Sequence, residues 1–239
     1  MSTMLNNAGL GVGAKGVGVA EAALQKAVGF AVDRVQGPTA EGAPGIIGHA
    51  DVRRMLPEAR AEVFAARAIA AACAVAIDMG NATKDPGWIA RAALLTPIAK
   101  AYGTDTGCKV ADTGVQVHGG MGFIEETGAA QYLRDARITT IYEGTNGIQA
   151  IDLVTRKIGL SGGETLKRLL AEYRNIANEV AKSNDPAFGK TAQRLNETLD
   201  ALERATAYMV AALNRDQAEA LAGATPYQKL FGLAAGGAY

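Results

Sequence analysis

Apolar residues recur at steps of three and four along most of the chain, and this spacing places them on one face of an α-helix. The clearest example runs from Asp51 to Met79, where the apolar positions are Val52, Met55, Leu56, Ala59, Val63, Ala66, Ala70, Cys73 and Ile77. Asp51 is placed to cap the start of this helix, and Gly80 followed by Asn81 can adopt the left-handed conformation that ends one. We therefore expect one long amphipathic helix over most of this segment.

Three more helices are predicted in the first two thirds of the chain. One spans Gly18 to Val35 and is followed by a loop rich in glycine and proline, residues 37–48. The others run from about Pro86 or Trp88 to Gly103, and from Asp105 to Val117, just before a pair of glycines. Four helices joined by short or moderate loops favour a bundle.

The helical pattern is interrupted after Ile158 by the sequence L-S-G-G-E, and three further helices are predicted beyond it: Glu164 to Lys182, Pro186 to Asn214, and one from near Gln217. We therefore expect an all-α fold in two parts. Residues 1–158 would form the four-helix bundle, and residues 160–239 an additional helical domain. Because the last helix ends in small apolar residues without a polar cap, we expect this second domain to be truncated.

Charge and cysteine content exclude several classes of function. The chain has 24 basic and 24 acidic residues, so it has no charge excess to attract nucleic acid or an anionic membrane. Its start lacks the pattern of a secretory signal, and no run approaches the roughly 20 apolar residues of a membrane span. Two cysteines without C-x-x-C spacing and two histidines make a metal site unexpected. We expect a cytoplasmic protein.

Two motifs suit a phosphate-bearing ligand. Q-V-H-G-G-M-G-F, residues 116–123, has three glycines after a helix end, where backbone amides can approach a phosphate or pyrophosphate. A plain glycine-rich turn explains the same pattern equally well. Arg34 lies in D-R-V-Q-G at the end of a predicted helix, where a cation also complements the helix dipole. Arg34 alone does not indicate a ligand site, and it becomes a candidate only together with the other motifs.

A third motif, I-Y-E-G-T-N-G-I-Q, covers residues 141–149 and contains a candidate catalytic carboxylate, Glu143. A helix is predicted to start just after it, capped by Thr145 or Asn146. A carboxylate at a helix entrance has a structural explanation as a favourable dipole partner. Gly144 and Gly147 favour a functional explanation, because a helix start does not need them and a closely approaching ligand does.

Taken together, these motifs and the intervening R-D-A-R-I resemble the C-terminal helical domain of the acyl-CoA dehydrogenase family. The resemblance covers about residues 4–158 and is most specific over 112–158. From Leu160 onward the chain resembles the extra helical domain of longer bacterial members, a subgroup that includes methylmercaptopropionyl-CoA dehydrogenases. In the family an N-terminal helical domain and a β-domain precede this region, so we expect the chain to be a fragment that lacks part of the flavin pocket.

The resemblance implies an oxidoreductase that dehydrogenates an acyl-CoA thioester between Cα and Cβ. Glu143 matches the base that removes the α-proton while the β-hydride passes to FAD. The backbone N–H of Glu143 and a ribityl hydroxyl of FAD would hydrogen-bond the thioester carbonyl as it becomes an enolate. Gly144 would contact the substrate.

The resemblance also implies a shared cofactor site. Gln116 and Gly120 would contact the adenosine diphosphate end of an FAD bound mainly to another subunit, with Arg34 at its pyrophosphate. Thr145 and Gly147 would lie near the FAD of their own subunit. A shared site implies a homo-oligomer, a dimer or tetramer, and an electron-transfer flavoprotein is the expected electron acceptor.

One position departs from the family pattern, and alternatives remain open. The opening N-N-A-G resembles a family segment in which an arginine usually follows N-N-A, whereas this chain has Gly9. The departure and the missing domains favour an alternative in which the chain is a non-catalytic helical module for oligomerisation or binding. An acyl-CoA oxidase-like activity and a plain structural bundle are the other hypotheses.

Overall fold

The structure, a computed structural model, describes residues 2–39, 42–183 and 185–239, with side chains from residue 7 onward. Regular structure in these ranges is entirely helical, which confirms the all-α prediction. Residues 40–41 of the predicted loop 37–48 lie outside the described residues. The helices are α1 (Ser2–Asp33), α2 (Ala50–Thr83), α3 (Pro86–His118), α4 (Gly120–Phe123), α5 (Ala129–Thr139), α6 (Asn146–Asp152), α7 (Glu164–Lys182), α8 (Thr191–Arg215) and α9 (Gln217–Ala238).

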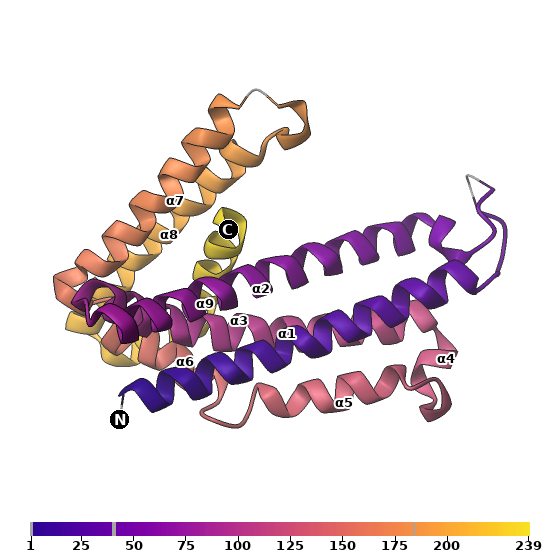
Figure 1. The fold of residues 1–239 in the computed structure, drawn as a ribbon, viewed down its shortest axis with the longest axis horizontal. Coiled ribbons are helices and arrows are strands. Elements are labelled where there is room, and N and C mark those ends of the chain that lie inside the picture. Colours follow the sequence, from indigo (N-terminus) through magenta and orange to yellow (C-terminus); the bar gives the residue numbers. More distant parts are fainter. Residues whose placement is uncertain (1, 40–41, 184) are drawn as a thin grey trace.

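Helices α1, α2, α3 and α5 form an elongated bundle in which the chain runs alternately up and down (Figure 1). Helices α1 and α3 run in the same direction, because Gly13 of α1 lies against Ala99 of α3 and Phe30, farther along α1, stacks on His118. Helix α2 returns antiparallel to both, and α5 runs back along the other side of the α1 and α3 pair.

Two of the four predicted bundle helices, ending at Gly103 and beginning at Asp105, are one continuous helix, α3. The fourth bundle helix is α5 instead. Gly103 was interpreted as a helix end because glycine costs about 1 kcal/mol in a helix interior. In the structure it serves close packing: a Cβ at Gly103 would lie 2.7 Å from the carbonyl oxygen of Gly13.

The ends of α1 and α2 also differ from the prediction. Helix α1 begins at Ser2 rather than Gly18, because Gly9, Gly13 and Gly16 of its first half pack against α3 instead of breaking the helix. Helix α2 has His49 rather than Asp51 as its N-cap residue. It ends at Thr83 with Lys84 in the left-handed conformation, donating its N–H to the carbonyl of Gly80. Helix α7 matches its predicted bounds.

A backbone-to-backbone contact joins α1 to α3. A Cβ at Gly16 would lie 2.4 Å from the carbonyl oxygen of Gly103, and one at Gly107 would lie 2.9 Å from the carbonyl oxygen of Gly16. Real Cβ atoms essentially never approach other atoms below 3.0 Å, so only glycine permits this helix separation. Lys100 and Thr104 of α3, whose Cα atoms lie next to glycines of α1, are fully buried.

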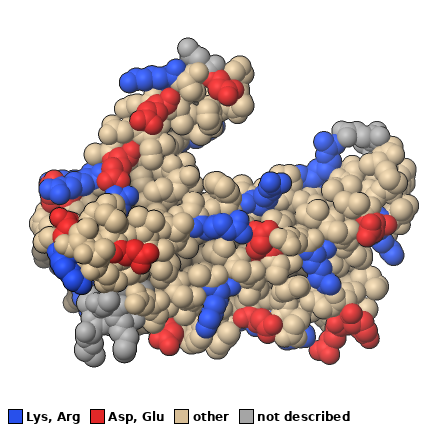
Figure 2. Space-filling model, viewed as in Figure 1, with Lys and Arg blue, Asp and Glu red and all other residues tan. Residues whose placement is uncertain are grey.

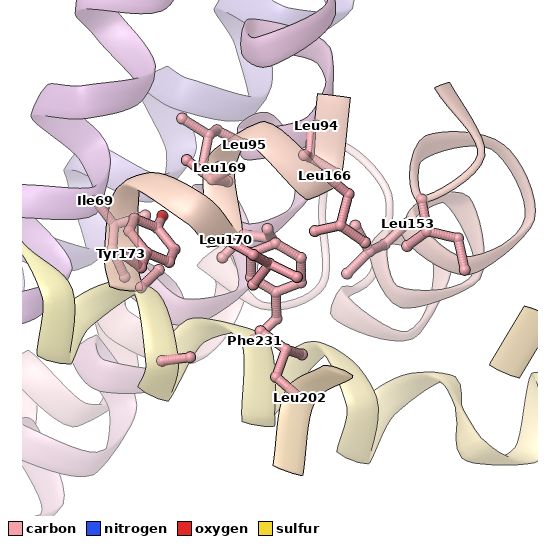
Figure 3. Packing of buried hydrophobic residues seen from close by; sticks show 14 of the residues in the cluster. Ile69, Leu94, Leu95, Leu153, Leu166, Leu169, Leu170, Tyr173, Leu202 and Phe231 are labelled. Atoms are coloured by element: carbon pink, nitrogen blue, oxygen red, sulfur yellow. The ribbon is translucent and has the colours of Figure 1, made fainter. Parts of the chain in front are cut away.

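Helices α7 and α8 form a hairpin that projects from one end of the bundle, and α9 returns between the hairpin and the bundle (Figure 1). One hydrophobic cluster unites these helices with α2 and α3 (Figure 3). Its labelled members are Ile69, Leu94, Leu95, Leu153, Leu166, Leu169, Leu170, Tyr173, Leu202 and Phe231. The two predicted domains therefore share a core, and the boundary between them stays a prediction.

Within the described ranges, α2 is long and apolar enough to cross a membrane by length and composition. Such a helix is weak support for a membrane span, since core helices of soluble proteins pass the same test. Its buried positions, among them Val63, Ile69 and Cys73, pack against other helices of the fold. These contacts account for the buried part of the apolar surface of α2.

Replacing Gly16 with alanine should lower the free energy of unfolding by roughly 1–3 kcal/mol, because the added methyl group would meet the backbone of α3. Gly18→Ala is the matched control, since Gly18 is exposed on the same helix with nothing within 4 Å of an added Cβ. That variant should gain up to about 1 kcal/mol from helix propensity. Urea unfolding followed by circular dichroism measures both, and equal losses would contradict the close contact.

Candidate functional site

Glu143 lies in the loop that connects α5 to α6, with its side chain exposed. Its φ of 54° is in the left-handed region, and Gly144 follows with a φ of 83°. A left-handed conformation costs a non-glycine residue roughly 1–2 kcal/mol. The loop therefore holds Glu143 in a strained backbone conformation, which surrounding contacts must maintain.

Contacts within the loop set the start of α6. The Thr145 side chain accepts a hydrogen bond from the N–H of Ile148 at 3.2 Å, so Thr145 rather than Asn146 caps the helix. The Gln149 side chain donates to the carbonyl of Glu143 at 3.3 Å. The N–H of Glu143 has no acceptor within the described part of the chain. An exposed carboxylate and a free backbone donor thus occur on one residue.

A polar network beneath the loop ties it to α3. Lys100 Nζ donates to the carbonyl of Gly144 at 2.9 Å and to Asn146 Oδ1 at 2.8 Å. The amide nitrogen of Asn146 donates to Thr104 Oγ1 at 2.9 Å and to Asp105 Oδ1 at 2.7 Å. Burial lowers the pKa of Lys100 and raises the pKa of Asp105. The network joins the loop to one face of a rigid helix.

Gln116, Gly120 and Arg34 form a second group at the far ends of α1 and α3. Gln116 is exposed near the end of α3, and Gly120 is exposed at the start of α4. Arg34 follows the end of α1 with an exposed guanidinium, which donates to Gln36 Oε1 at 3.2 Å. The Phe30 and His118 rings, with centroids 4.3 Å apart, hold these two helix ends together.

His118 is a packing residue. Its ring is buried against Phe30, and Nδ1 lies 2.6 Å from the carbonyl oxygen of Gly114, one turn earlier in α3. No cluster of three or more metal-ligating side chains occurs among the residues that the structure describes.

The two groups of candidate residues lie far apart. Lys100, beneath the Glu143 loop, and His118, beside the second group, are separated by eighteen residues of α3, which is roughly 27 Å of helix. The structure thus brings Glu143, Gly144, Thr145 and Gly147 together in one loop and helix start, and brings Arg34, Gln116 and Gly120 together elsewhere. A single small ligand does not reach both groups.

Gly9, the departure from the family pattern, is buried against α3. A Cβ at this position would lie 2.8 Å from Thr96 Cγ2. The Thr96 hydroxyl is itself buried and donates to the carbonyl of Ala92 at 2.7 Å. A larger residue such as arginine at position 9 therefore requires the Thr96 side chain or one of the two helices to shift.

Comparisons with known proteins agree with these motifs. The family described as "Acyl-CoA dehydrogenase, C-terminal domain" matches residues 1–158, and "Acetyl-CoA dehydrogenase C-terminal like" matches residues 169–239. The chain belongs to the acyl-CoA dehydrogenase family. It is 40% identical to 3-methylmercaptopropionyl-CoA dehydrogenase of Ruegeria pomeroyi, over 97% of this chain and 40% of that protein. It is 35% identical to a butyryl-CoA dehydrogenase of Syntrophomonas wolfei, over 79% of this chain and 32% of that protein.

Solved structures have the same fold. Caenorhabditis elegans ACDH-11 in complex with C11-CoA superposes with a TM-score of 0.79 at 18% identity, covering 97% of this chain and 39% of the other. An acyl-CoA dehydrogenase from Bacillus anthracis complexed with FAD gives a TM-score of 0.75 at 19% identity, covering 98% and 41%. The chain therefore spans about 40% of the length of these relatives, which it matches over nearly its whole length.

Sequence reasoning missed Lys100, Thr104 and Asp105, which support the candidate loop from below. A signal for Lys100 was present, because it is the one charged residue in the apolar stretch A-A-L-L-T-P-I-A-K-A-Y-G, residues 92–103. A lysine within a largely apolar helical stretch is expected to lie in the core. Such a lysine is expected to need a partner inside the fold.

The left-handed conformation of Glu143 predicts an unusual order of stability. Because only glycine adopts a positive φ without steric cost, Glu143→Gly should be more stable than Glu143→Ala by roughly 0.5–1 kcal/mol. At Glu179, which is exposed in α7, the alanine variant should instead be more stable than the glycine variant by about 1 kcal/mol. Thermal unfolding of the four variants measures both differences. The same order at both positions would rule out the strained backbone.

Proposed function

We propose that the protein of this chain is an FAD-dependent acyl-CoA dehydrogenase in which Glu143 is the catalytic base. The observation that carries the proposal is the Glu143 residue itself: an exposed carboxylate next to its own free N–H, held on a constrained loop. The family membership and the names of the relatives, among them the 3-methylmercaptopropionyl-CoA dehydrogenase, support the reaction class.

Glu143 combines two functions in this proposal. Its carboxylate accepts the α-proton of the acyl thioester, a role that contributes typically 10²–10⁴-fold to a rate. Its backbone N–H donates a hydrogen bond to the thioester carbonyl, which becomes negatively charged as the α-proton leaves. Gly144 lacks a side chain and leaves room for the substrate beside this donor. Bound FAD supplies the acceptor for the β-hydride.

The residues of the second group fit the adenosine diphosphate end of FAD. Nothing lies within 4 Å of a Cβ built at Gly119 or Gly120, so a phosphate can approach this backbone closely. The exposed guanidinium of Arg34 and the amide of Gln116 would hold the pyrophosphate and its neighbouring groups. Thr145 and Gly147 would lie at the FAD of their own subunit, on the exposed first turn of α6.

The roughly 27 Å along α3 between the two groups supports a homo-oligomer, a dimer or tetramer, in which each FAD is shared between subunits. Exposed apolar side chains beside both groups also support covered surfaces in the whole protein: Phe123 is 82% exposed and Ile148 is 55% exposed. We propose an electron-transfer flavoprotein as acceptor and a cytoplasmic location. Lys, Arg, Asp and Glu are interspersed on the face seen in Figure 2, which gives no support to a nucleic-acid partner.

The first test is the visible absorption spectrum of the purified chain with added FAD and then an acyl-CoA. Flavin that binds and is bleached by the acyl-CoA would support a working site formed by the chain and its oligomer. Flavin that binds without bleaching would favour the alternative, a non-catalytic module. Where the chain binds no flavin, the same experiment is repeated in a complete enzyme that contains the flavin-binding β-domain.

Glu143→Gln in the complete enzyme should lower the rate of flavin reduction by at least about 100-fold, because the amide keeps the shape of the side chain and loses its basicity. Bound FAD should be unchanged. Stopped-flow absorbance of the flavin measures the rate, and Glu179→Gln, on the exposed surface of α7, is the matched control with normal turnover. Near-normal flavin reduction by Glu143→Gln would show that Glu143 is not the catalytic base.

Arg34→Gln should weaken FAD binding by roughly tenfold or more, since a hydrogen bond to a charged group contributes about 1.5–3 kcal/mol. Titration of the apoenzyme with FAD, followed by flavin fluorescence, gives the affinity. Arg204→Gln, at an exposed position of α8, is the control and should bind FAD normally. Unchanged affinity in Arg34→Gln would remove this residue from the cofactor site.

A further inference from the structure

Lys100 is a buried cation with an unusual set of partners. The whole residue is 0% exposed in the middle of α3. Within the described chain no carboxylate lies at ion-pair distance from its Nζ. Its hydrogen bonds go instead to the carbonyl of Gly144 and the side chain of Asn146, both in the Glu143 loop. Both hydrogen bonds of the Lys100 ammonium therefore go to the loop, and Asp105 of the same helix acts on its charge from a longer distance.

Packing alone does not account for an ammonium at this position. Removing an ammonium group from water costs several kcal/mol even after a protein relaxes. A methionine has a similar length and would fill the same space beneath α1 without that cost. What the ammonium adds is two charge-assisted hydrogen bonds to the loop, each stronger than a bond between neutral groups.

The loop needs such support, because two successive residues, Glu143 and Gly144, have positive φ angles. Two of its other side-chain contacts are longer: Gln149 donates to the carbonyl of Glu143 at 3.3 Å, and Lys15 donates to the Tyr142 hydroxyl at 3.4 Å. The Asn146 amide nitrogen adds shorter bonds to Thr104 and Asp105 of α3. The bonds from Lys100, at 2.9 and 2.8 Å, come from a fully buried donor on a rigid helix. They fix the peptide that follows Gly144.

We propose that Lys100 is the positioning residue of the candidate base: by holding the Gly144 carbonyl and the Asn146 side chain, it fixes the direction of the Glu143 carboxylate and N–H. This inference rests on the proposed function of Glu143. Asn146 transmits the constraint, since its Oδ1 accepts from Lys100 while its amide nitrogen donates to Asp105 at 2.7 Å. Lys100 itself does not touch the substrate in this scheme.

The first test measures amide hydrogen exchange in the chain itself, without catalysis. Lys100→Met should raise exchange of the hydrogen-bonded amides within residues 142–149, such as those of Asn146 and Gln149, at least tenfold relative to amides of α7. Lys109→Met is the matched control: Lys109 lies on the same helix and binds Glu58 and Glu62 on α2, away from the loop. It should leave exchange of residues 142–149 unchanged. Unchanged loop exchange in Lys100→Met overturns the proposal.

A second variant keeps the test decisive where Lys100→Met fails to fold. Asn146→Ala removes one of the two acceptors of Lys100 from the loop side, at a partly exposed position. Faster exchange of residues 142–149 in Asn146→Ala supports the proposal, and exchange equal to that of the unsubstituted chain overturns it.

The third measurement separates this inference from the proposed function. In the complete enzyme, Lys100→Met should lower kcat about tenfold or more while KM and FAD affinity change less than about twofold, whereas a merely structural role would weaken FAD binding as well. Inactive Glu143→Gln together with a normal kcat in Lys100→Met overturns the inference and leaves the proposed function standing. Active Glu143→Gln overturns both, whatever the loop exchange shows.

Discussion

The close contact between the backbones of α1 and α3 is the constraint on which the rest of the structure depends. Gly13 and Gly16 of α1 meet Gly103 and Gly107 of α3 at distances that no other residue type permits. Close approach along these two helices buries the face of α3 that carries Lys100 and Thr104, although both are polar. Buried polar groups require partners, and the loop between α5 and α6 supplies them. The position of the candidate base is thus a consequence of helix packing.

The same pair of helices also separates the two groups of candidate residues. Because α1 and α3 run in the same direction, the loop between α5 and α6 lies beside the middle of α3, and Arg34, Gln116 and Gly120 lie at or just beyond the far ends of the two helices. Figure 1 shows the elongated bundle that separates them. The two groups of candidate residues can therefore contact different neighbouring molecules. This separation suits the cofactor site shared between subunits that we propose.

The last helix completes the fold by a second set of close contacts. A Cβ at Gly232 of α9 would lie 2.4 Å from the Tyr102 ring, and one at Gly236 would lie 2.7 Å from the Ala65 side chain. Through these contacts α9 packs against the core that α2, α3, α7 and α8 share (Figure 3). The Gln228 side chain donates to the carbonyl of Pro97 at 3.0 Å, in the turn of α3 just before Lys100. The second part of the chain therefore also supports the helix beneath the loop.

The sequence by itself determined the helical class, the long amphipathic α2, the bounds of α7 and the family, because periodicity and short motifs are local properties. It also indicated Glu143, through the glycines beside it. Tertiary structure decided that α3 is continuous at Gly103, since a glycine that breaks a helix and one that admits a neighbouring backbone look alike in sequence. Tertiary structure alone also joined Lys100 to Gly144, forty-four residues away, because contacts between distant segments depend on how helices pack.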